Sequence, residues 1–174
     1  NADLSIERVL KSIMDQAKSL VGAQVASVFL VDEQNEELYS TVNSTGGELR
    51  IPITSGVAGR VASSGAPIIV HDAYCDKRFN AAVDEKTGFT TRSIMCLPIQ
   101  HYKLGIIGVA QLINKTSSGI LAAVTGGQEQ EVTHFTDDDQ HFFQVLASQA
   151  AVAIVNSGFF DLEHRCGSRR GSGA

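Results

Sequence analysis

Hydrophobic residues recur every three or four positions at both ends of the chain, which is the spacing of an amphipathic helix. The first such pattern runs from Leu4 to Leu20, and Gly22 is placed to end it. The second follows Thr136, which forms a capping-box pattern with Asp139, and it continues to about position 162. Small residues dominate the apolar stripe of this second helix. The pattern therefore predicts one helix at each end of the fold.

Between the two helices, short apolar segments bounded by turn residues are typical of strands. Two short helical segments, 56–62 and 81–85, interrupt them. The predicted strands are 25–31, 37–43, 48–53, 67–70, 90–100 and 104–114. This order predicts an α+β sandwich with a central, mostly antiparallel sheet. Both terminal helices would cover one face, and a ligand pocket would lie under loops and short helices on the other.

Two polar segments stand apart from these elements. The connection from Lys115 to His134 is interrupted only by the apolar residues 120–124, and connections of that length are usually functional or disordered. The residues 164–174 are rich in Gly, Ser and Arg, so we expect a disordered tail. The length of 174 residues fits one domain, predicted over 1–163.

Composition narrows the classes of partner. The 14 Lys and Arg against 19 Asp and Glu give a net charge of −5, which argues against a nucleic-acid surface. No apolar run approaches the roughly 20 residues of a membrane helix, and we expect no signal peptide. Cys75, Cys96 and Cys166 are widely spaced and odd in number, so we interpret them as free thiols in a reducing, cytoplasmic compartment.

Two segments carry candidate binding chemistry. The helix predicted at Gly56 begins with glycine, and the free N–H groups of such a helix start favour an anion; the glycines could equally serve only a tight turn. Asp84, Thr87 and Thr91 lie in a polar segment just before a buried strand pair, where they suit a small polar ligand or form an ordinary polar loop. Neither a nucleophile–base pair nor metal-ligand spacing appears, so the sequence favours a ligand sensor over a catalyst and predicts no metal.

A set of short motifs occurs in order along the chain. They are Ser27–Leu30, Arg50–Pro52, Gly56–Gly59, Asp72–Tyr74, Arg78–Asn80, Val83–Asp84, Thr87–Phe89, Thr91–Ser93 and Gly108–Lys115. Together they resemble the regulatory GAF domains of cyclic-nucleotide phosphodiesterases and of related cyanobacterial adenylyl cyclases. The resemblance covers roughly Leu4 to Leu162. It implies a GAF-type sandwich that binds a cyclic nucleotide without hydrolysing it.

The resemblance implies a specific set of contacts. Backbone N–H groups of Val57 and Ala58 would bind the cyclic phosphate. The remaining ligand-binding residues would be Thr87 and Thr91 at the phosphate or ribose, Asp84 and Asn80 in a lid, Ser27 and Asn43 facing the base, and Gln111 on the strand beneath. Asn43 stands where several cyclic-GMP-binding relatives have Asp. An amide can pair with adenine through one donor and one acceptor, so we favour cyclic AMP over cyclic GMP, although an amide can also flip to serve guanine.

The family also carries a dispersed motif that supports nucleotide binding. Here it reads Asn114-Lys115, Phe135 and Asp139, with Gln140 where Glu is usual. Loss of that charge would remove any ion pair that requires it. The resemblance further implies a homodimer through the terminal helices and a downstream phosphodiesterase catalytic domain.

Two alternatives remain open at the level of sequence. The domain could have lost its ligand and only dimerise, which Asn43, Gln140 and the long 115–134 connection would support. It could instead be a cysteine-dependent reductase of the kind known on the GAF fold. Such chemistry needs a thiolate near a resolving thiol, and Cys75 in its polar loop is the most plausible reactive thiol.

Overall fold

The structure is a computed structural model that describes residues 2–43, 45–124 and 134–158, with side chains described except at 2–4 and 122. The predicted tail 164–174 and the predicted end of the last helix lie outside the described residues. The Cys166 thiol lies outside them as well.

One six-stranded sheet forms the centre of the fold. Its strands are β1 (Ala23–Asp32), β2 (Glu37–Val42), β3 (Leu49–Pro52), β4 (Ile68–Val70), β5 (Ile94–His101) and β6 (Gly105–Lys115). They lie in the order β3-β2-β1-β6-β5-β4, and every neighbouring pair is antiparallel. This arrangement confirms the predicted sheet.

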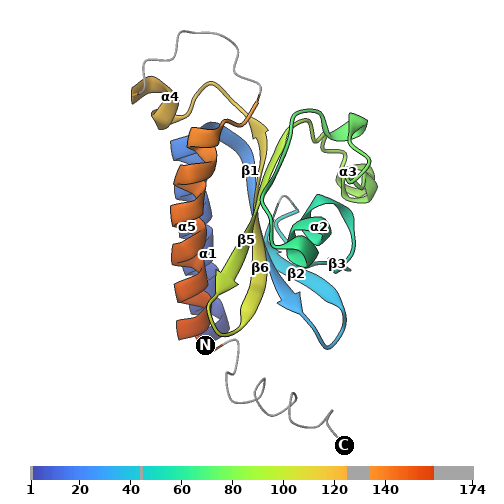
Figure 1. The fold of residues 1–174 in the computed structure, drawn as a ribbon, viewed down its shortest axis with the longest axis vertical. Coiled ribbons are helices and arrows are strands. Elements are labelled where there is room, and N and C mark those ends of the chain that lie inside the picture. Colours follow the sequence, from blue (N-terminus) through green and yellow to red (C-terminus); the bar gives the residue numbers. More distant parts are fainter. Residues whose placement is uncertain (1, 44, 125–133, 159–174) are drawn as a thin grey trace, which may run out of the picture.

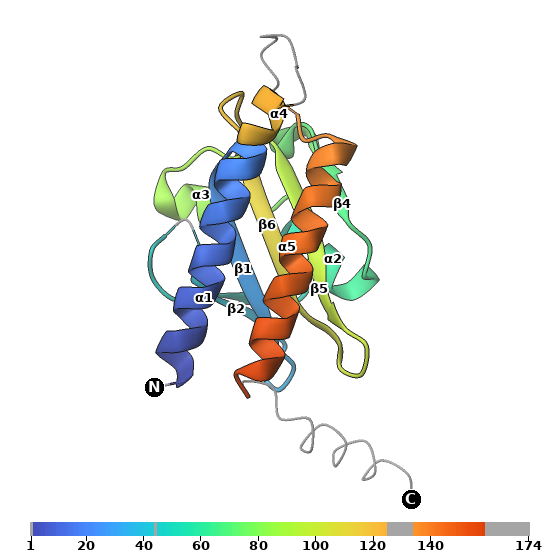
Figure 2. The ribbon, with the colours of Figure 1, turned by 90° about the vertical axis from the view of Figure 1, so that its left-hand side faces the viewer.

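Helices cover both faces of the sheet, so the fold has three layers (Figure 1). The long terminal helices α1 (Ala2–Ala17) and α5 (Asp137–Asn156) lie side by side on one face (Figure 2). The short helices α2 (Gly56–Ser64) and α3 (Ala82–Thr87) lie on the other, near a 3₁₀ turn at Ala73–Cys75. The predicted α+β sandwich, with its terminal helices on one face, is confirmed.

The alternation of side chains along β1 produces two separate cores. Val28 and Leu30 point into a large core shared with α1 and α5. Phe29 and Val31 point the other way, into a smaller core with Val57 of α2 and its neighbours. Because side chains in a strand alternate between faces, each hydrophobic face of the sheet packs against its own helical layer.

Most predicted boundaries shift by at most two residues, and three elements show larger differences. Residues 90–93 are not part of a strand, and β5 begins at Ile94. The first helix changes to a π-helical turn at Lys18–Gly22 instead of staying α-helical to position 20. The last helix ends at Asn156, and two residues expected on buried stripes, Val9 and Phe142, are 41% and 46% exposed.

Part of the long connection between β6 and α5 packs tightly on the fold. A short helix, α4 (Ile120–Val124), follows Gly119, which lies against the π-helical turn. A Cβ atom on Gly22 would come within 2.8 Å of the Gly119 backbone nitrogen, and Gly22 has a φ of +83°. The two glycines therefore allow a close backbone crossing that no larger residue fits.

Candidate functional site

A cavity of about 320 Å³ lies between the sheet and the short helices α2 and α3. Residues from β1, β3, β5 and β6 form its floor and sides, and the segment 89–93, which we call the strap, closes it next to α3. Eight of the nine predicted ligand-binding residues line it: Ser27, Asn43, Val57, Ala58, Asn80, Asp84, Thr91 and Gln111. Thr87 lies outside the lining, and its hydroxyl donates to the Val83 carbonyl oxygen at 2.9 Å.

The N-terminus of α2 points into this cavity. The amide N–H groups in the first turn of a helix have no carbonyl partner within the helix, and both Val57 and Ala58 are buried in the cavity wall. The Asn80 amide donates to the Ser55 hydroxyl at 3.0 Å and accepts from the Ala82 N–H at 2.9 Å. This amide therefore joins the start of α2 to the start of α3.

A buried carboxylate fastens the strap to α3. Asp84, only 8% exposed, accepts hydrogen bonds from the N–H and the hydroxyl of Thr91, each at 2.7 Å. The Tyr74 hydroxyl donates a third at 2.8 Å, and this bond to Asp84 raises the pKa of Tyr74. We call this set the Asp84 clamp. In this arrangement the Thr91 hydroxyl proton is directed to Asp84, so it is not free for a ligand.

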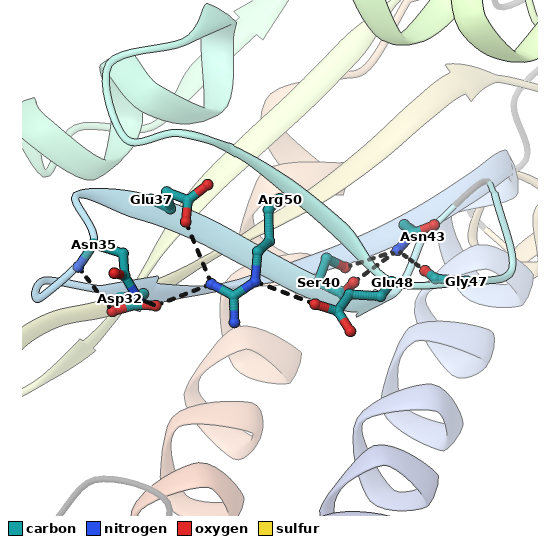
Figure 3. A network of polar contacts seen from close by, with 8 residues as sticks. All are labelled: Asp32, Asn35, Glu37, Ser40, Asn43, Gly47, Glu48 and Arg50. Carbon is teal, nitrogen blue, oxygen red and sulfur yellow. Dashed lines mark hydrogen bonds and ion pairs between the residues drawn. The ribbon is translucent and has the colours of Figure 1, made fainter.

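Asn43 also lines the cavity, and its amide holds the β2–β3 turn (Figure 3). Its nitrogen donates to the Ser40 carbonyl at 3.1 Å and to the Gly47 carbonyl at 2.9 Å. Its oxygen accepts from the N–H of Thr45 at 2.9 Å. Both ends of the amide are therefore engaged by the turn, and the predicted contact with a base requires those bonds to be released or shared.

Sequence reasoning missed Arg50 as a lining residue. This side chain on β3 forms ion pairs with Asp32 at 3.0 Å, Glu48 at 3.1 Å and Glu37 at 3.6 Å (Figure 3). It also lies over the Tyr39 ring, 4.5 Å from the ring centre. The pKa of Asp32 is lowered by hydrogen bonds from Asn35 first and then Arg50. Except for Glu48, the partners of Arg50 reach it only through strand register, so no local pattern signals the whole network.

The floor of the cavity is polar at one point. Ser27 on β1 and Gln111 on β6 are direct cross-strand partners, and both line the cavity. Among the described residues neither side chain has a hydrogen-bond partner. The surrounding lining is apolar and includes Phe29, Phe79 and Phe89. A hydroxyl and an amide within an aromatic surround provide hydrogen bonds to a planar polar ligand.

The residues of the dispersed motif lie outside this cavity, at one end of the sheet. The Lys115 ammonium reaches the Asp139 carboxylate at 3.0 Å and the Val21 carbonyl at 2.5 Å, and both charged side chains are at most 4% exposed. Asp139 also completes the predicted capping box with Thr136 at the start of α5. These contacts, which we call the Lys115 joint, tie β6 to the ends of α1 and α5.

Asn114 connects the Lys115 joint to the strap. Its backbone has a φ of +62°, and its side-chain oxygen accepts from the N–H groups of Arg92 at 2.6 Å and Ser93 at 3.2 Å. Its nitrogen donates to the Thr90 carbonyl at 3.0 Å and to Gln24 at 2.9 Å. One side chain thus fixes the backbone on both sides of Thr91.

Gln140, the residue that departs from the family pattern, is not needed for the buried ion pair. The Lys115–Asp139 pair forms without it, and Phe135 is buried beside the large core. The motif therefore keeps its charge pair despite the substitution.

The described cysteines are unsuited to thiolate chemistry. Cys75 is exposed, and its thiol donates to the Asp72 carboxylate at 3.2 Å, which raises its pKa. Burial raises the pKa of Cys96 much further. Within the described ranges, no group of three or more His, Cys, Asp or Glu side chains is placed to hold a metal ion. The helices of the described residues include none that could cross a membrane.

The sequence matches the family model of the GAF domain over residues 5–154. This chain belongs to the GAF domain family. The GAF-type fold and the resemblance noted from the motifs are both confirmed by this match and by the relatives below.

The curated relatives of this GAF domain are phosphodiesterases. A probable 3',5'-cyclic phosphodiesterase of Caenorhabditis elegans is 35% identical over 172 residues, which is 91% of this chain and 21% of that protein. A dual 3',5'-cyclic-AMP and -GMP phosphodiesterase 11A of Takifugu rubripes is 40% identical over 66% of this chain and 11% of its own length. A cGMP-specific 3',5'-cyclic phosphodiesterase of Drosophila erecta is 34% identical over 79% of this chain and 12% of its own length. The chain thus spans between 11% and 21% of the length of these proteins.

Solved structures share the fold at low identity. The GAF domain of a Coxiella burnetii phosphoenolpyruvate-protein phosphotransferase superposes with a TM-score of 0.70 at 18% identity, covering 87% of this chain and 83% of that one. A free methionine-R-sulfoxide reductase from Neisseria meningitidis superposes with a TM-score of 0.57 at 21% identity, covering 87% and 85%. These similarities concern the fold alone.

Proposed function

We propose that this GAF domain binds a cyclic nucleotide in the 320 Å³ cavity and regulates a cytoplasmic phosphodiesterase to which it is linked. The observation that carries the proposal is the distribution of polar groups in the cavity. Free helix N–H groups at Val57 and Ala58 lie in one part of its wall, and Ser27 with Gln111 form a polar floor within aromatic residues. The first suits a phosphate and the second a base. The names of the curated relatives support the same ligand class.

The charges of the cavity suit a singly charged ligand. Its charged lining residues are Arg50, Lys86 and Asp84. Arg50 is held by three carboxylates, and Asp84 is satisfied by neutral donors. The cyclic phosphate would therefore be bound mainly by backbone N–H groups, which favour an anion without a buried cation. A volume of about 320 Å³ lies at the lower end of the range of small-molecule sites, roughly 300–1,000 Å³.

Cyclic AMP is the favoured ligand, because an amide at Asn43 complements adenine better than a carboxylate would. In the present arrangement the Asn43 amide forms hydrogen bonds within the β2–β3 turn. Recognition through Asn43 would therefore accompany a rearrangement of the β2–β3 turn.

Ligand binding would reach the terminal helices through the strap. A nucleotide in the cavity stabilises the strap and α3 in the closed position. Asn114 holds the strap backbone, and the neighbouring Lys115 joint holds α1 and α5. A ligand shifts such an equilibrium only by its differential affinity for the two positions.

The outer face of the terminal helices would form a homodimer. Val145 and Val152 on α5 are 58% and 60% exposed, and Phe142 on α5 and Val9 on α1 are exposed as well. A row of apolar side chains on paired helices suits a second copy of the same helices. The readout would then be a change in the packing of the two copies and of the linked catalytic domain.

Calorimetric titration with cyclic AMP and with cyclic GMP tests the proposal, after ligand that co-purified has been removed by unfolding and refolding. We expect saturable binding, tighter for cyclic AMP. Ala58→Pro removes one phosphate-facing N–H at a first-turn position that a helix tolerates, so it should weaken binding about tenfold or more, since a charge-assisted hydrogen bond contributes roughly 1.5–3 kcal/mol. Ala58→Ser keeps the N–H and is the matched control. No heat and no rise in melting temperature with either nucleotide would refute ligand binding.

One observation favours the alternative of a dimerisation module without ligand. The polar atoms of Asn43, Asp84 and Thr91 already satisfy one another or the local backbone. Concentration-dependent dimerisation together with an absence of nucleotide binding would favour this alternative. The reductase alternative is weakened by the raised pKa of Cys75; a methionine sulfoxide reductase activity that disappears in Cys75→Ser would restore it.

A further inference from the structure

A second cavity, of about 570 Å³, lies on the other side of the strap. Thr91 lines the first cavity, whereas Thr90 and Arg92 line the second, and Phe89 lines both. The strap is therefore a shared wall. The other lining residues of the second cavity are Gln24, His71, Asp72, Ser93, Asn114, Lys115 and His134.

Four side chains that can carry positive charge line this second cavity: Arg92, His71, His134 and Lys115. The Arg92 guanidinium forms no ion pair with any described carboxylate. The His71 and His134 rings are in edge contact, with centroids 4.5 Å apart and planes at 67°. Lys115 also lines the cavity, but its ammonium is paired with Asp139. The acidic lining residue is Asp72, which accepts from the Cys75 thiol.

The uncharged lining residues present donors because their acceptors are already used. The Gln24 side-chain oxygen accepts from Asn114 at 2.9 Å, so its NH₂ group is left to donate. The Ser93 hydroxyl oxygen accepts from the Lys115 N–H at 3.0 Å, which leaves its O–H to donate. Donors and cations around one concave surface match an anion with several acceptor oxygens. A metal ion suits the site less well, since no third ligand joins the two imidazoles among the described residues and Arg92 would repel it.

We propose that the second cavity binds a small dianion of the phosphate class, held by Arg92 and by protonated His71 and His134. Two imidazolium rings in contact repel each other, and a bound dianion offsets that repulsion. Anion binding is therefore coupled to proton uptake by the histidine pair. The charged groups that face the pair are Arg92, Asp72 and Lys115.

A sulfate titration of the chain at pH 6.0 and 8.0, at constant ionic strength in chloride, tests this proposal. Sulfate stays a dianion over this range, so any pH dependence reports the protein. We expect saturable changes in the imidazole C–H resonances of His71 and His134, with binding about fivefold or more tighter at pH 6.0 because imidazole protonates in this range. Inorganic phosphate and glycerol 3-phosphate then distinguish a site for free phosphate from one for a phosphate monoester.

Three variants distinguish sulfate binding at this site from nonspecific electrostatic attraction of sulfate. Arg92→Gln and His71→Gln should each weaken sulfate binding about fivefold or more, as removal of one charge-assisted hydrogen bond does. Arg60→Gln removes an exposed arginine on α2 and should leave binding unchanged. The side chains of Arg92, His71 and Arg60 are exposed, so we expect the three variants to fold like the wild type. Unchanged melting temperatures would verify this. Shifts that do not saturate, equal sulfate affinity in Arg92→Gln, or histidine resonances that respond to Zn²⁺ and not to sulfate would each overturn the proposal.

Discussion

Two buried carboxylates, Asp84 and Asp139, each hold separate segments of this domain together, but with different partners. Asp84 fastens the strap with neutral donors from residues within ten positions in the sequence. Asp139 pairs with Lys115, which also binds the end of the first helix at Val21, so this joint connects three distant segments. The first carboxylate lines a cavity and bonds the strap, whereas the second lies at the start of α5.

The comparison teaches which contacts can open. Hydrogen bonds between neutral groups and a carboxylate at a cavity wall can be exchanged for water or ligand at modest cost. An ion pair in which both side chains are at most 4% exposed cannot lose one partner without leaving a buried charge. We therefore expect the Asp84 clamp to respond to ligand and the Lys115 joint to stay closed.

The largest expected effect follows from removing one charge of the Lys115 joint. Asp139→Asn leaves the buried ammonium of Lys115 without its carboxylate, so the free energy of unfolding should fall by about 3–5 kcal/mol, as for other broken buried pairs. Urea denaturation measures this loss. Asp138→Asn, the exposed neighbour in the same helical turn, is the control and should cost far less. Equal losses in the two variants would show that the joint is not the stabilising feature.

A smaller loss should follow from Gly22→Ala, next to the joint. A left-handed backbone costs a non-glycine residue about 1–2 kcal/mol, and the new Cβ would also clash with the Gly119 backbone. Gly46→Ala is the matched control, since Gly46 has a φ of +72° but open space around it. The difference in free energy of unfolding between the two variants measures the crowding alone. If the two variants lose the same stability, the close crossing is not tight.

At the clamp, Asp84→Asn should cost about 1–3 kcal/mol of unfolding free energy, because an amide nitrogen replaces one acceptor of the Thr91 donors. Amide exchange at Thr91 should become faster, while exchange in α5 should not change. Glu85→Gln, exposed on the same helix, serves as the control. An Asp84→Asn protein whose Thr91 amide exchanges as slowly as the wild type would contradict the clamp.

The smallest expected effect is on the pH dependence of stability, through a third carboxylate, Asp76. The side-chain and backbone hydrogen bonds from Arg78 lower the pKa of Asp76 to about 2. Because the folded pKa lies below the unfolded value of about 3.9, this contribution is present above that value and is lost as the pH falls toward 2. Arg78→Gln should flatten this part of the stability curve between pH 5 and 2. Melting temperatures of the wild type and of Arg78→Gln over that range measure the difference. Identical pH dependences in the two proteins would contradict the prediction.

Much of the scaffold could be predicted because its signals are local. The alternation along β1, the period of α1 and α5, and the capping box at Thr136 all depend on residues within a few positions of one another. The strap was predicted as strand because Thr90–Ser93 looks like the start of one. These residues do not join the sheet, because the Asn114 side-chain amide forms hydrogen bonds with strap backbone groups that would otherwise pair with a neighbouring strand.

The candidate site was predictable as a set of residues but not in its bonding. The motifs placed eight of nine residues at one cavity. They did not indicate that the Asn43 amide is hydrogen-bonded within the β2–β3 turn, or that Thr91 donates to Asp84. Arg50 was missed because Asp32 and Tyr39 reach it only through the register of β1, β2 and β3.

The most direct test of the central claim is amide hydrogen exchange with and without cyclic AMP. If the cavity binds the nucleotide and the strap is its lid, exchange at Thr91, Arg92 and Ser93 should slow about tenfold or more, as for a segment whose local opening is suppressed. The amide of Asp139, in the Lys115 joint, donates to Thr136 and should exchange at the same rate in both states. Strap amides unaffected by saturating cyclic AMP, or a joint that exchanges as fast as the strap, would contradict the account.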